Sequence, residues 1–65
     1  MIVEDIIKEL DGGVNVKIET MFESGKIVTY YNGLAHDVPY RNIHLNVLFL
    51  DIKQNTLIIR VDWGK

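Results

Sequence analysis

The sequence predicts an α+β domain in which an N-terminal amphipathic helix packs on a five-stranded antiparallel β-meander. The sheet is expected to be either open or curled as an SH3-like small barrel. Three observations predict this class. Apolar residues recur at helical spacing near the N-terminus, and the hydrophobic period changes to two from Val14 onward. Three short turn signals, Ser24-Gly25, Asn32-Gly33 and Gln54-Asn55, then divide the alternating segments.

The length and composition of the chain predict a single domain over residues 1–65. Its 65 residues lie near the lower size limit for independent folding, and no cysteine is present to form a disulfide or a thiolate metal site. No apolar run approaches the ~18 residues of a membrane span. The N-terminus, Met1 to Asp5, is acidic and lacks the basic region of a signal peptide. These features predict a soluble, cytoplasmic protein.

The helix is predicted over residues 2–10. Glu4 and Asp5 fall in its first turn, where the helix dipole favours negative charge. Asp11-Gly12-Gly13 is expected to end the helix, because glycine accepts the left-handed conformation of a helix C-terminus. A helix this short needs a surface to lie on. The residues expected to face the sheet are Ile2, Val3, Ile6, Ile7 and Leu10.

The first two turn signals predict two consecutive hairpins. Asn32-Gly33 is the strongest hairpin signal in the chain and is expected to have positive φ at both positions. Pro39 cannot donate to a strand ladder, so the strand after this turn should end near Val38. With a two-residue turn at Ser24-Gly25, Ile18 lies opposite Tyr31, Thr20 opposite Thr29 and Phe22 opposite Ile27. With a two-residue turn at Asn32-Gly33, Tyr31 lies opposite Leu34, Thr29 opposite His36 and Ile27 opposite Val38.

The third turn signal predicts a terminal hairpin with one aliphatic face. A two-residue tip at Gln54-Asn55 pairs Ile52 with Leu57, Leu50 with Ile59 and Leu48 with Val61. Leu50 and Ile59 are therefore expected to be opposed core residues. The five predicted strands span residues 14–22, 26–31, 34–38, 47–52 and 57–62.

The face of the sheet opposite the helix is the predicted functional surface. It carries more apolar side chains than a solvated sheet face normally does. Either the sheet curls over them, or they form an exposed patch that binds a protein partner or a second copy in a homodimer. The predicted interface residues are Met21, Val28, Tyr30, Phe49 and Ile58.

No residue pattern predicts catalysis, metal binding or a cofactor site. His36 and His44 have no third ligand at a matching spacing, and His36 is expected to be partly buried opposite Thr29. Ser24 lies at a turn with no histidine in register. We therefore expect a non-enzymatic protein-interaction module with no catalytic, metal-binding or cofactor-binding residues and no small-molecule substrate.

Two alternative functions involve nucleic acids. A small β-barrel could stack bases on Tyr30 and Phe49, with Lys17 and Arg60 nearby. The net charge of −2 and the scattered basic residues argue against nucleic acid as a partner. The other alternative is an acidic inhibitor of a host nucleic-acid-binding enzyme. Its acidic surface would contain Glu19, Glu23, Asp37, Asp51 and Asp62.

The second half of the chain carries one recognisable motif. Gly33-x-x-x-Asp37-Val38-Pro39-Tyr40 precedes the hairpin from Val47 to Val61. This combination resembles many small proteins of Gram-positive bacteria, which tend to be encoded on phages, plasmids and integrative elements. Those proteins usually carry acidic residues after the Pro-Tyr pair, where this chain has Arg41, Asn42 and His44. The resemblance implies a mobile-element accessory protein and carries over no functional residues.

Overall fold

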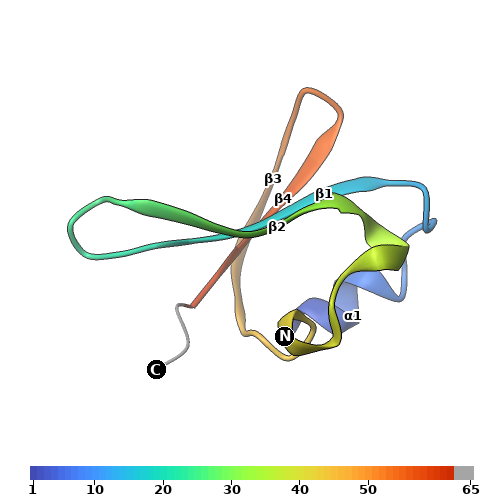
Figure 1. Cartoon of the computed structure of the whole chain (residues 1–65), viewed down its shortest axis with the longest axis horizontal. Coiled ribbons are helices and arrows are strands. Elements are labelled where there is room, and N and C mark those ends of the chain that lie inside the picture. The colour runs from blue at the N-terminus through green and yellow to red at the C-terminus, as the bar shows by residue number, and fades with distance from the viewer. Residues whose placement is uncertain (63–65) are drawn as a thin grey trace.

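The computed structural model describes residues 1–62 of the chain. Its strands form one mixed sheet in the order β2-β1-β4-β3 (Figure 1). β1 and β4 run parallel at the centre, and each also forms an antiparallel hairpin with the outer strand next to it. The elements are α1 (Val3–Ile7), β1 (Asn15–Met21), β2 (Ile27–Leu34), the 3-10 helices η1 (Ala35–Asp37) and η2 (Tyr40–Asn42), β3 (Val47–Lys53) and β4 (Thr56–Val61).

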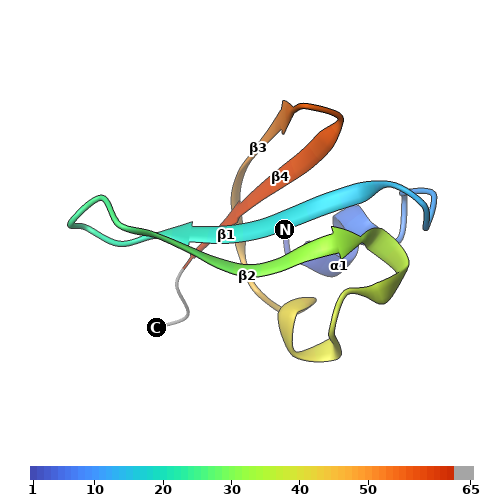
Figure 2. The same cartoon turned by 45° about the horizontal axis from the view of Figure 1, so that its top comes forward.

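The α+β class is confirmed, but the predicted strand arrangement is wrong. Within residues 1–62 the sheet has four strands, one of its pairings is parallel, and it does not close into a barrel. The two hairpins leave the parallel junction in different directions (Figures 1 and 2). Their turns point away from α1 and the 3-10 helices, which lie together on the other side of the molecule. The helical segments therefore cover only part of the sheet.

The core is small and centred on the parallel junction. Its fully buried side chains come from the middle of β1, the end of β4 and the helical segments. Side chains that alternate along neighbouring strands reach the same face, so the junction collects apolar residues from both hairpins. The buried apolar residues are Val3, Val16, Ile18, Ala35, Ile59 and Val61.

The helix is shorter than predicted. α1 ends at Ile7, and the chain continues to Leu10 in turns held by i→i+3 hydrogen bonds from Glu9 and Leu10 N–H groups. The Asp5 carboxylate accepts a hydrogen bond from the Ile2 N–H (2.9 Å), which satisfies one free donor at the N-terminus. Neither Gly12 nor its neighbour adopts positive φ, so the predicted glycine cap is wrong. No helix in residues 1–62 is long and apolar enough to cross a membrane.

The N-terminus is tied to the connection that precedes β3. The N–H of Val3 donates to the Leu45 carbonyl (3.0 Å), and the Val47 N–H donates to the Met1 carbonyl (2.9 Å). Ile2 forms an isolated antiparallel bridge with Asn46. These bonds hold α1 against the chain where it enters β3, which places the apolar face of the helix over the junction.

The predicted turn at Asn32-Gly33 does not form. Both residues lie inside β2, opposite Lys17 and Val16, and neither has positive φ. Residues 35–37, which were expected to lie in a strand, form η1 instead. The Tyr31 side chain lies over Gly33, and its hydroxyl donates to the Leu34 carbonyl (2.7 Å). Gly33 therefore leaves room for the Tyr31 ring to lie close to the backbone of β2. No turn forms here because β2 continues to Leu34 and pairs with the first half of β1.

The hairpin of β1 and β2 contains two irregularities that compensate each other. The Phe22 N–H bonds the Lys26 carbonyl (2.9 Å), so the turn has three residues rather than two, with Gly25 in the left-handed region (φ 92°). This extra residue shifts the register by one, and a bulge at Tyr30 shifts it back. The predicted pair of Ile18 and Tyr31 is therefore confirmed. Nearer the turn, the predicted pairs are wrong: Thr20 lies opposite Val28, and Met21 lies opposite Ile27.

The hairpin of β3 and β4 is the best-predicted element. Gln54 and Asn55 form its two-residue tip, with φ of 52° and 64°. Leu50 lies opposite Ile59, and Ile52 lies opposite Leu57, as expected. A bulge at Leu48 breaks the predicted pair with Val61, which lies opposite Val47 instead.

Candidate protein interface

The sheet face opposite α1 is built from rows of paired residues that cross the strands. Directly paired residues in neighbouring strands place their side chains on the same face. The row at the end of the parallel junction contains Phe49, Arg60, Glu19 and Thr29, and the row at its middle contains Asp51, Ile58, Lys17 and Asn32. We call this surface the outer face.

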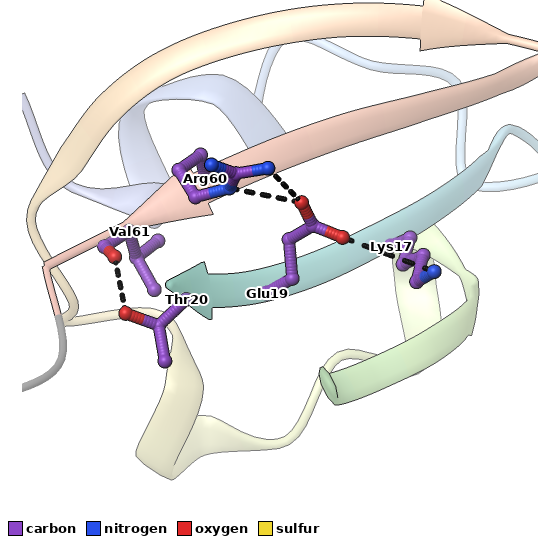
Figure 3. A network of polar contacts seen from close by, with 5 residues as sticks. All are labelled: Lys17, Glu19, Thr20, Arg60 and Val61. Carbon is purple, nitrogen blue, oxygen red and sulfur yellow. Dashed lines mark hydrogen bonds and ion pairs between the residues drawn. The ribbon is translucent and has the colours of Figure 1, made fainter. Parts of the chain in front are cut away.

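A buried ion pair occupies the centre of the outer face (Figure 3). Glu19 Oε2 accepts hydrogen bonds from Arg60 Nε (2.9 Å) and from a terminal guanidinium nitrogen (2.5 Å). The Glu19 side chain is 6% exposed and that of Arg60 is 15% exposed. Lys17 Nζ lies 3.8 Å from the other carboxylate oxygen. The carboxylate thus has two cationic partners, which offset part of the cost of burying its charge.

The ion pair also contacts an aromatic ring, and a separate hydrogen bond joins β1 to β4 on the opposite face. The Arg60 guanidinium carbon lies 4.9 Å from the centre of the Phe49 ring, within the range of a cation–π contact. On the opposite face, the buried Thr20 hydroxyl donates to the Val61 carbonyl (2.8 Å, Figure 3). Because Glu19 is enclosed, it does not contribute to the acidic surface expected of an enzyme inhibitor.

The five predicted interface residues do not share one face. Met21, Phe49 and Ile58 lie on the outer face by their pairings. Val28 lies opposite Thr20 on the side of the core, and Tyr30 packs against the core residues. The physical reason is the bulge at Tyr30, because one extra residue reverses which side chains of β2 point outward.

The outer strand β3 exposes a continuous set of apolar side chains. Leu50 and Ile52 point to the same face as the core, but the helical segments do not reach them, so their expected burial is wrong. The Ile52 N–H donates to Asp51 Oδ1 (2.8 Å), which shows that this amide is directed to the open edge rather than to β4. The exposed fractions are 62% for Leu48, 48% for Phe49, 45% for Leu50 and 72% for Ile52.

Sequence reasoning missed this edge for a geometric reason. The alternation in residues 47–52 identified which side chains share a face but not whether a helix covers that face. One signal was available: a helix of about ten residues is only about 15 Å long, too short to cover two hairpins. The alternation of apolar and polar residues does not depend on the order of the strands in the sheet, so it could not show that β3 lies at an edge.

The histidines lie away from this surface and away from the core. His36 lies in η1 and is exposed, so its predicted burial opposite Thr29 is wrong; its Nε2 is 3.1 Å from Asp37 Oδ1. The His44 ring packs edge-on against Tyr40 with centroids 4.9 Å apart. Residues 1–62 contain no group of three or more side chains that could hold a metal ion.

Comparison with known proteins does not change this assignment of the surface. No protein-family model, curated protein or solved structure matches this chain.

Proposed function

We propose that this protein is a small interaction module that binds another polypeptide strand along the open edge of β3. The observation that carries the proposal is the exposure of Leu48, Phe49, Leu50 and Ile52 on an outer strand. An added strand would pair with the outward-facing backbone groups of the edge, taking the place of the Asp51 carboxylate at the Ile52 N–H, and would cover the apolar side chains at the same time. Phe49 belongs both to this edge and to the interface expected from the sequence.

The other outer strand, β2, is less suited to strand addition. Its bulge at Tyr30 lies in the middle of the strand and interrupts the regular row of backbone groups. In β3 the bulge lies at Leu48, near the start, so Phe49 to Lys53 remain regular. A regular run of this length is the better template for a partner strand.

The partner that fits this edge best is a second copy of the chain. Two antiparallel β3 strands related by a two-fold axis at Leu50 would place the two Leu50 side chains opposite each other. The same register brings Leu48 of each copy beside Ile52 of the other. The exposed aliphatic residues of the two copies would then form a second small core, a large gain for a domain whose own core is thin.

The proposal is tested by measuring the oligomeric state with light scattering at micromolar to millimolar concentration. The parent chain should form a dimer. Ile52→Lys should give a folded monomer, because dimerisation would bury its ammonium against aliphatic side chains. Circular dichroism should stay near that of the parent, since Ile52 contributes little to the core.

The matched control is Ile27→Lys on β2. Ile27 is also exposed and aliphatic and also lies on an outer strand. This variant should remain dimeric. A parent chain that is monomeric at millimolar concentration would exclude the second copy as partner. Loss of the dimer in Ile27→Lys but not in Ile52→Lys would move the interface to β2.

That this protein is encoded on a mobile element remains a prediction, which rests on the resemblance of residues 31–61 to small proteins of Gram-positive bacteria. It is compatible with an interaction module but does not identify the partner.

A further inference from the structure

A groove on the outer face forms a second distinctive surface. It has a volume of about 560 Å³ and extends from the start of the β3–β4 hairpin tip to the first half of β1. Lys17 and Ile58 are partners in the parallel pairing of β1 with β4, and Asn32 continues the same row into β2, so the groove crosses three strands of the sheet. The groove is lined by Lys17, Asn32, Lys53, Gln54, Thr56 and Ile58.

The lining of the groove is rich in hydrogen-bond donors and contains no carboxylate. Two ammonium groups, two side-chain amides and one hydroxyl line it, and Ile58 is its apolar member. Lys53 forms no ion pair within residues 1–62. Lys17 lies near Glu19, but the carboxylate of Glu19 already accepts two hydrogen bonds from Arg60. The groove therefore carries positive charge that the protein only partly neutralises.

We infer that this groove binds a small phosphate-bearing ligand of about the size of a mononucleotide. Lysine ammonium groups bind phosphate as point charges, and the amide and hydroxyl donors can complete the coordination of its oxygens. The volume lies within the range of small-molecule sites, which is roughly 300–1,000 Å³. Ile58 offers an apolar contact for a ring or chain attached to the phosphate.

The charge around the groove selects a small ligand rather than a nucleic-acid strand. Asp51 neighbours Ile58 in the same cross-strand row, and the chain as a whole has a net charge of −2. A nucleic-acid strand that extended beyond the groove would be repelled by the neighbouring carboxylates, and no continuous basic surface would bind its other phosphates.

The test is a titration of the full ¹⁵N-labelled chain with inorganic pyrophosphate and with ADP at constant ionic strength. Amide resonances of Lys17, Lys53, Gln54 and Thr56 should shift in a saturable manner. Lys53→Gln and Lys17→Gln should each weaken binding about threefold or more, because each removes one charge from a site with two. Asp51→Asn should strengthen binding.

The control is Lys26→Gln, at the tip of the other hairpin. It removes the same charge from the protein but lies outside the groove. Affinity should not change. Equal weakening by Lys26→Gln, or no saturable shift at the groove with either ligand, would overturn the inference. A single-stranded oligonucleotide that binds more tightly than ADP, with shifts spread beyond the groove, would overturn the choice of a small ligand.

Discussion

Glu19 and Arg60 form an almost fully buried ion pair between two strands that lie 41 residues apart in the sequence. The pair joins the two hairpins across the parallel junction of β1 and β4, where the residues are in direct register. Two of the three guanidinium nitrogens of Arg60 donate to the same carboxylate oxygen of Glu19. The junction is thus held on one face by charge and on the other by aliphatic packing.

Removing one member of this pair should be costly. Glu19→Ala leaves the Arg60 guanidinium in a poorly solvated position, and we expect a loss of about 2–4 kcal/mol in the free energy of unfolding. Replacing both residues with methionine should recover much of that loss, since no unpaired charge remains. Urea unfolding followed by circular dichroism measures both. As a control, Lys8→Ala removes an exposed ion pair with Asp5 and should change stability by no more than about 0.5 kcal/mol.

The opposed residues Ile59 and Leu50 should differ strongly in their contribution to stability. Ile59 is fully buried, so Ile59→Ala should cost about 2–4 kcal/mol. Leu50 is 45% exposed in the single chain, so Leu50→Ala should cost about 1 kcal/mol or less at concentrations where the chain is monomeric. The measurement is a pair of urea melts. Equal losses would mean that the middle of β3, at Leu50, is covered in solution.

Gly33 should be intolerant of any side chain. A Cβ at this position would lie 2.7 Å from the Tyr31 hydroxyl oxygen, so Gly33→Ala should cost about 1–3 kcal/mol through overpacking. Gly13→Ala is the control, because its Cβ would lie no closer than 3.8 Å to the nearest atom and its φ is not positive. In a Tyr31→Leu background the penalty at Gly33 should fall. A penalty that is unchanged in that background would show that the ring is not its cause.

Tyr31 should contribute to unfolding at high pH. Partial burial, with a smaller effect from the Asp37 carboxylate, raises the pKa of its phenol above the ordinary value of about 10. Because the folded-state pKa is the higher one, the contribution to stability is complete below pH ~10. It is lost as the pH rises from there through the folded-state pKa. Tyr31→Phe should flatten the decline of stability in this window, whereas Tyr40→Phe, at an exposed position, should not. Urea melts at pH 9 to 11.5 measure the slope.

The sequence predicts local pairing in this chain much better than it predicts long-range order. The tip at Gln54-Asn55 and the pairs next to it are confirmed, because turn chemistry and alternation act over a few residues. The parallel pairing of β1 with β4 was not predicted, since alternation is the same for parallel and antiparallel neighbours. The Asn32-Gly33 signal failed because pairing with the first half of β1 outweighs the local turn preference.

The candidate interface could be predicted only in part. An excess of apolar residues over what one short helix can cover was visible in the sequence, and Phe49 was correctly placed on the outer face. The bulge at Tyr30 could not be read from the pattern, and a single inserted residue reassigns Val28 and Tyr30 to the other face. The edge position of β3 depends on the strand order, which requires knowing how the two hairpins meet.

The parallel junction also determines the order of events during folding. Each hairpin joins residues close in sequence and can form in roughly 1–10 μs, whereas β1 meets β4 only after a loop of about forty residues has closed. Pairings between distant segments slow folding more than local ones do. We therefore expect the slow step to be the docking of two preformed hairpins, completed as the N-terminal segment closes over the connection at Leu45 and Val47.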